Sequence, residues 1–109
     1  ALNPMVIDGC EVIPLTSRED LKHEGSKMHH CVATCWRDCV DGRSRIFSIR
    51  SKDGRSTLEL RNGADTWGIA QHNGVCNDQP PKYHRRIACK VLYAYQDATF
   101  ESVFPLEAG

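Results

Sequence analysis

The sequence has no excess of charge of either sign, because its 14 lysine and arginine residues are balanced by 14 aspartate and glutamate residues. A dedicated nucleic-acid-binding domain usually carries a strong basic excess, so this balance argues against that class while leaving room for a local basic patch. Long apolar runs are also missing, since none approaches the roughly 18 residues that a membrane-spanning helix requires. We therefore expect no membrane partner.

The sequence shows no signal peptide, no initiator methionine, no internal repeat and no low-complexity segment. Its 109 residues are enough for one hydrophobic core but not for two. We therefore expect a single domain over residues 1–109. The missing initiator methionine is compatible with a fragment of a longer protein.

The six cysteines lack the spacing of a disulfide framework. Cys31, Cys35 and Cys39 recur at intervals of four, which gives parallel side chains on one helix, whereas a disulfide needs converging Cβ vectors. Reduced thiols are typical of the cytoplasm, so we predict a cytoplasmic location. No Cys-x2-Cys pair is present, and we predict neither a metal nor a cofactor. A zinc site remains an alternative, built from some of His30, Cys31, Cys35, Cys39, Cys76 and Cys89.

Residues 24–42 organise the chain, and they hold half of its six cysteines. A helix from residue 26 or 27 to residue 40 is predicted, because apolar side chains recur there with helical spacing. This buried stripe consists of Val32, Cys35, Trp36, Cys39 and Val40. The N-terminus of a helix lowers the pKa of a thiol, so Cys31 is the cysteine most suited to be reactive.

Short strands and a second long helix flank this stretch. Before it we expect an extended segment with an Asp-Gly turn, an edge strand over 10–15, and a short capped helix over 17–23 that Gly25 ends. After it we expect strands over 45–50, 57–61 and 66–71, then a helix over 82–97 followed by a short strand or tail. The predicted fold class is α+β: an antiparallel three- to four-stranded meander packed on one face against two longer helices.

The Asp53-Gly54 turn predicts a hairpin register in which Ile49 faces Leu58 and Phe47 faces Leu60. One face of the sheet is then apolar, and the third strand adds Trp67 and Ile69 to it. The opposite, polar face holds Ser48, Arg50, Thr57, Glu59 and Gly68. Gln71 falls on the apolar side unless the third strand twists, carries a bulge or ends early.

Over roughly residues 11 to 80, the order and spacing of a set of residues resemble those of the PcfJ-like family. The set consists of Leu21, Glu24-Gly25, Met28, His30-Cys31-Val32, Ile46 to Arg50, Thr57-Leu58-Glu59, Gln71, Gly74 and Asn77. Members of that family are encoded on conjugative plasmids, phages and other mobile elements. The resemblance therefore implies a mobile-element context, and a protein partner in the conjugation machinery.

The polar members of this set predict one shared site near the start of the helix over 26–40. They are His30, Cys31, Arg50, Glu59, Gln71 and Asn77. In this interpretation Cys31 is a nucleophile, His72 or His30 is its base, and Asn73 or Asn77 orients the base. The alternative is that Cys31 acts as a small, half-buried hydrophobe.

A compact basic run near the start of the last helix could contact phosphate groups of a nucleic acid or nucleotide. It consists of Lys82, His84, Arg85 and Arg86, with Tyr83 among them. Two functions therefore compete. One is a small enzyme acting on nucleic acid, a nucleotide or a protein conjugate. The other is a non-catalytic accessory or interaction domain in conjugative DNA transfer.

Overall fold

The computed structural model describes residues 4–28, 36–52, 54–63 and 66–103. In chain order the elements are β1 (Met5–Ile7), β2 (Cys10–Leu15), α1 (Arg18–Met28), α2 (Trp36–Val40), β3 (Ser44–Ser51), β4 (Gly54–Asn62), β5 (Trp67–Asn73), the 3-10 helix η2 (Val75–Asn77) and α3 (Lys82–Val103). Among the helices of these residues, none has the length and apolar character needed to cross a membrane.

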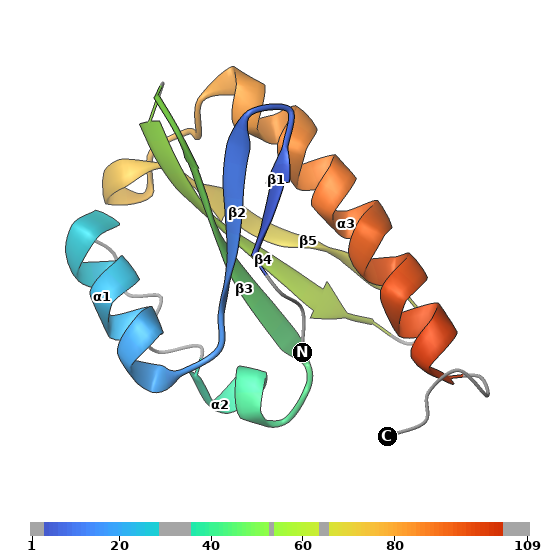
Figure 1. Cartoon of the computed structure of the whole chain (residues 1–109). Coiled ribbons are helices and arrows are strands. Elements are labelled where there is room, and N and C mark those ends of the chain that lie inside the picture. Colours follow the sequence, from blue (N-terminus) through green and yellow to red (C-terminus); the bar gives the residue numbers. More distant parts are fainter. Residues whose placement is uncertain (1–3, 29–35, 53, 64–65, 104–109) are drawn as a thin grey trace.

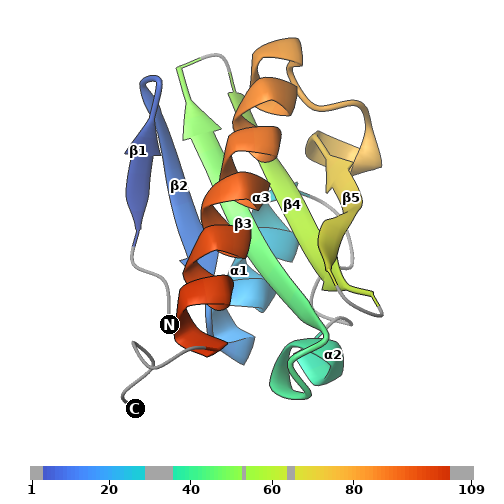
Figure 2. The same cartoon turned by 90° about the vertical axis from the view of Figure 1, so that its right-hand side faces the viewer.

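The strands form one antiparallel sheet of five strands in the order β1-β2-β3-β4-β5. The α+β class and the meander are confirmed, with five strands where three to four were predicted. The helices lie on opposite faces: α3 covers one face, and α1 and α2 lie on the other (Figures 1 and 2). The prediction of two helices on one face was wrong, because both faces of β3 bury side chains, Ile46 on one and Phe47 on the other.

The larger core lies between the sheet and α3. Ile87, Val91 and Tyr95 form the buried line of α3, as their spacing predicted, and they pack on Phe47 and Leu58 of the central strands. The rings of Phe47 and Tyr95 meet edge to face at a centroid distance of 6.2 Å. This helix continues to Val103, beyond the predicted end at residue 97.

A smaller core lies on the other face, where Leu15, Leu21 and Ile46 are buried and Trp36 and Cys39 pack against them. The predicted stripe of the helix over 26–40 is only partly correct. Cys39 is half-buried and Val40 is 62% exposed, because α2 contributes only one edge to this core. Val32 and Cys35 lie outside the described residues.

Helix α1 begins where predicted and ends later. Ser17 Oγ accepts a hydrogen bond from the backbone N–H of Asp20 at 3.0 Å, and the Asp20 carboxylate accepts one from the N–H of Thr16 at 3.3 Å. The helix then passes through Gly25 to Met28, so the predicted stop at Gly25 was wrong. Gly25 is buried on the inner face of α1, together with Leu21, Glu24 and Met28.

The β3–β4 hairpin has the predicted faces but a different register. Phe47 lies opposite Leu58, and Ser51 lies opposite Gly54. The pair that closes the hairpin is therefore Ser51 with Gly54, where the predicted turn at 53 and 54 would have closed it one residue later, and every pair is shifted by two residues. A shift of two keeps each side chain on its predicted face, because the side-chain period of a strand is two.

The edges of the sheet differ from prediction at β2. This strand is internal, because residues 5–7 form β1 and pair with it through the Asp8-Gly9 turn. Among the described residues, pairing with β1 ends at Val12, before Pro14. The turn itself was predicted correctly, with φ of 50° at Asp8 and 84° at Gly9.

Strand β5 carries a bulge opposite Glu59 and Leu60. Leu60 pairs with Ile69 and Glu59 pairs with Gln71, which leaves Ala70 as the extra residue. The bulge places Gln71 on the same face as Glu59.

We predict that Gly74→Ala destabilises the fold by about 1–3 kcal/mol, because a Cβ built at Gly74 would lie 2.7 Å from the backbone oxygen of Gln79. Gly68→Ala is the matched control, since nothing lies within 4 Å of a Cβ at that position. Urea unfolding would measure both free energies. Equal effects of the two substitutions would contradict the close approach at Gly74.

Candidate functional site

Glu24 is a buried acidic residue in the middle of α1, with 0% of its surface exposed. Its Oε1 accepts hydrogen bonds from Arg55 Nε at 3.1 Å and Nη2 at 2.5 Å, and its Oε2 accepts one from Thr57 Oγ1 at 2.5 Å. A buried carboxylate is tolerated only when it is paired and hydrogen-bonded. Strand β4 supplies both partners, so this cluster fixes α1 on the sheet.

Arg50 lies at the rim of the same cluster. Its Nε donates to Ser48 Oγ at 3.0 Å, and its Nη2 lies 4.0 Å from Glu24 Oε1. Arg50 also stands directly opposite Arg55 in the β3–β4 register. Two arginines thus flank one carboxylate, and the side chain of Arg50 is the more exposed, at 35% against 22%.

Glu59 and Gln71 continue this face along β4 and β5. Glu59 is buried, and its Oε2 accepts a hydrogen bond from Ser44 Oγ at 2.7 Å. Gln71 is exposed, and its Oε1 accepts one from Asn73 Nδ2 at 3.2 Å. We call the whole set the α1-side polar face; it consists of Glu24, Arg50, Arg55, Thr57, Glu59 and Gln71.

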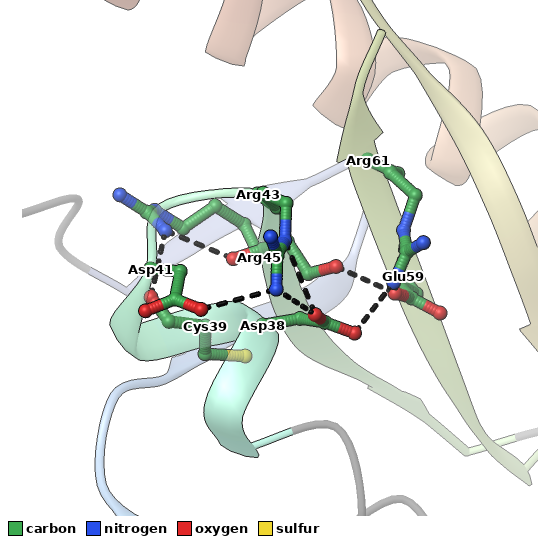
Figure 3. A network of polar contacts seen from close by, with 8 residues as sticks. Asp38, Cys39, Asp41, Arg43, Arg45, Glu59 and Arg61 are labelled. Carbon is green, nitrogen blue, oxygen red and sulfur yellow. Dashed lines mark hydrogen bonds and ion pairs between the residues drawn. The ribbon is translucent and has the colours of Figure 1, made fainter.

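A network of ion pairs closes the lower end of this face and fastens α2 to β4 (Figure 3). Asp38 of α2 accepts hydrogen bonds from Arg61 Nη2 at 2.6 Å and from Arg43 Nη2 at 2.9 Å. The Arg43 hydrogen bond is the main reason why the pKa of Asp38 is lowered, with Arg61 adding to the effect. Arg61 Nε also lies 3.6 Å from Glu59 Oε2. Because these residues pair with one another at the surface, we assign the network a structural role.

The structure pairs Glu59 with Gln71, but it separates Glu59 from Arg50, because Glu59 lies opposite Ile46 and Arg50 lies opposite Arg55. Arg50, Glu59 and Gln71 share the α1-side polar face, and the β5 bulge is what puts Gln71 there. Asn77 lies in η2, which contacts α1 but also lines a pocket beside α3. His30 and Cys31 lie outside the described residues, so the full six-residue site stays a prediction.

The sequence reasoning did not include Glu24 and Arg55 in the site. The signal for Glu24 was present, because Leu21, Glu24, Gly25 and Met28 follow the helical spacing of one buried face. Ending the helix at Gly25 concealed that spacing. No comparable signal marks Arg55, whose role depends on the hairpin register.

A second polar group lies on the α3 side of the sheet. Ser56 Oγ is 2.9 Å from His72 Nε2 and 2.7 Å from His84 Nδ1, and His84 Nε2 is 2.8 Å from Ser51 Oγ. His84 is fully buried. It therefore does not belong to the exposed basic run, which consists of Lys82, Arg85 and Arg86.

His72 remains neutral near pH 7. Burial, with smaller contributions from the nearby His84 and Arg85, lowers its pKa from 6.5 to about 4. A neutral imidazole presents one N–H donor and one acceptor nitrogen, so each hydrogen bond in the chain from Ser51 to His72 has a defined direction for a given tautomer.

The described residues contain no group of three His, Cys, Asp or Glu side chains that could hold a metal ion. Three of the predicted alternative zinc ligands, His30, Cys31 and Cys35, fall outside those residues. Cys76 and Cys89 are exposed, free thiols. The prediction of a metal-free protein therefore stays open.

A family model described as PcfJ-like protein matches residues 4–88 of the chain. The chain belongs to the PcfJ-like family. The match includes every residue that carried the resemblance and extends it to β1 and the start of α3. No curated protein and no solved structure matches the chain.

We predict that Glu24→Gln destabilises this PcfJ-like fold by about 3 kcal/mol, because it removes the buried charge that pairs with Arg55. Glu19→Gln, on the exposed first turn of the same helix, should cost less than about 1 kcal/mol. Chemical denaturation of the two variants provides the measurement. A Glu24→Gln protein as stable as Glu19→Gln would show that the buried pair contributes little.

The lowered pKa of His72 predicts a pH dependence. The unfolded chain binds a proton near pH 6.5 whereas the folded chain does so near pH 4, so the free energy of unfolding should fall as the pH drops through that window. Between about pH 7 and about pH 5, His72→Gln should lose less stability than the wild type. His23→Gln, at an exposed position of α1, should behave like the wild type. If the free energy of unfolding varies with pH in the same way for all three proteins, the lowered pKa of His72 is refuted.

Proposed function

We propose that the α1-side polar face is the substrate site of this PcfJ-like chain, and that Arg50 contacts a phosphate of a nucleic acid there. The observation that carries the proposal is the partly exposed side chain of Arg50, which lies at the rim of a face where Glu24, Thr57 and Glu59 are buried. The mobile-element setting of the family supports a nucleic-acid substrate.

The surroundings of Arg50 suit a directed phosphate contact. Its Nε donates to Ser48, which orients the guanidinium, and its side chain is 35% exposed. Guanidinium groups bind phosphate through two parallel N–H donors, so a fixed plane lowers the entropic cost of binding. Both carboxylate oxygens of Glu24 already accept hydrogen bonds, Oε1 from Arg55 and Oε2 from Thr57.

Charge near Arg50 limits the affinity. Glu11 of β2 lies opposite Arg50 in the sheet and is exposed, so its carboxylate opposes an incoming phosphate. Together with the zero net charge of the chain, this predicts modest binding that weakens with salt.

A reaction at this site would use the residues that follow α1. In the proposal Cys31 is the nucleophile and His30 assists it, next to Glu59 and Gln71, in a protein of the cytoplasm. The alternative is a non-catalytic accessory domain, in which the same face binds nucleic acid or a protein of the conjugation machinery without changing it.

Fluorescence anisotropy with a short labelled single strand and its duplex tests the proposal. Arg50→Ala should weaken binding roughly tenfold at low salt and reduce the salt slope by about one, because one phosphate contact is lost. Glu11→Gln should act in the opposite direction and tighten binding, since it removes the opposing charge.

Arg18→Ala is the matched control, because it removes one positive charge from an exposed position at the start of α1. If Arg50→Ala and Arg18→Ala weaken binding equally, the contact at Arg50 is wrong.

Gel analysis of the bound strand separates the two functions. A change in the strand that Cys31→Ser abolishes supports the enzyme, and unchanged strand supports the accessory domain.

A further inference from the structure

A pocket of about 440 Å³ lies on the other side of the molecule from the α1-side polar face, between the end of β5, the segment from η2 to Pro80, and the start of α3. Its volume lies within the range of roughly 300–1,000 Å³ typical of small-molecule sites. Its polar lining is provided by His72, Asn73, Asn77, Asp78, Arg85 and Cys89. The proposed nucleic-acid contact uses none of these residues.

The lining combines one cation with amides and an apolar wall. Among the described lining residues Arg85 is the one cationic side chain, and the apolar members are Ile69 of β5, Pro80 and Ala88 of α3. Asp78 also lines it, and its carboxylate accepts a hydrogen bond from the backbone N–H of Gln79 at 2.7 Å. A single guanidinium suits one phosphate group, and apolar side chains with amides suit a planar heterocycle that carries donors and acceptors.

His72 makes the pocket wall selective. Its Nε2 is held by Ser56, and Ser56 is held by the fully buried His84. The ring of His72 is thus fixed from behind the pocket, and as a neutral group it adds a directed hydrogen bond without adding charge. A ligand is therefore recognised by one charge and by the pattern of its hydrogen-bonding edge.

We propose that this pocket binds a nucleoside carrying one terminal phosphate, with the phosphate on Arg85 and the base between Ile69 and Ala88 within reach of His72. The same chemistry is found in a free nucleoside monophosphate and in the phosphorylated end of a single strand. The site is separate from the proposed contact at Arg50, because its lining includes neither Arg50 nor any other residue of the α1-side polar face, although β5 contributes to both.

Isothermal titration with each nucleoside monophosphate, the matching nucleoside and inorganic phosphate tests the proposal. At least one monophosphate should bind clearly more tightly than either of its parts. Arg85→Ala should weaken that binding about tenfold, whereas Arg86→Ala, the neighbouring exposed arginine outside the pocket lining, should have little effect. Comparing short strands with and without a 5′ phosphate distinguishes the free nucleotide from the strand end.

Cysteine alkylation gives a second readout that does not depend on substitutions in the pocket. Cys89 lines the pocket, and Cys76 is an exposed thiol of η2 that lies outside the lining. The bound monophosphate should slow alkylation of Cys89 by N-ethylmaleimide and leave alkylation of Cys76 unchanged, as peptide mass mapping would show.

Three results would each overturn the proposal. They are equal alkylation rates at Cys89 with and without nucleotide, equal effects of Arg85→Ala and Arg86→Ala on binding, and binding of phosphate as tight as that of the nucleotide. Because Arg50→Ala should leave these results unchanged, they can fail or succeed separately from the proposed nucleic-acid contact.

Discussion

The buried carboxylate of Glu24 is the constraint on which the arrangement of the α1 layer depends. An ionised group without exposed surface is stable only while its hydrogen-bond partners stay in place. Both of its close partners, Arg55 and Thr57, belong to β4, so the position of α1 is coupled to the register of the central hairpin. This coupling explains how a helix with few large apolar side chains on its inner face is oriented on the sheet.

The sheet separates two chemically different layers. On the α1 side, charged groups approach one another beneath and beside a helix, and Arg50 extends from them to the surface. On the α3 side, aromatic and aliphatic packing dominates, and a buried polar chain runs through His84. The 3-10 helix η2 stands at the end of the sheet where the layers meet, since it contacts α1 and also supplies Asn77 to the pocket.

Periodicity in the sequence was sufficient for the parts of the fold that packing alone determines. The line of Ile87, Val91 and Tyr95 was correct, and so were the two faces of the central hairpin. The register was wrong by two residues, because the Asp-Gly signal placed Gly54 inside the turn, whereas Gly54 pairs with Ser51 as the first residue of β4. Gly25 was read as a helix end because glycine is common there, whereas in the fold it lies on a buried helical face.

The candidate site was less accessible to sequence reasoning than the fold. Glu24 is identifiable only once the helix is known to pass through Gly25. The placement of Gln71 depends on a bulge, for which no residue in β5 is diagnostic. The separation of His84 from its basic neighbours follows from its pairing with Ser51 and Ser56, two small residues that carry no sequence signal of their own.

The bulge at Ala70 has a consequence for how the length of this strand can vary among relatives. Ala70 is the one unpaired residue between Ile69 and Gln71, and it is exposed. A relative without a residue at this position would have a regular strand in which Ile69 still faces α3 and Gln71 still faces α1. Alignments of PcfJ-like sequences can therefore place a one-residue gap here without exchanging the side chains of the two layers, whereas a gap elsewhere in β5 would exchange them.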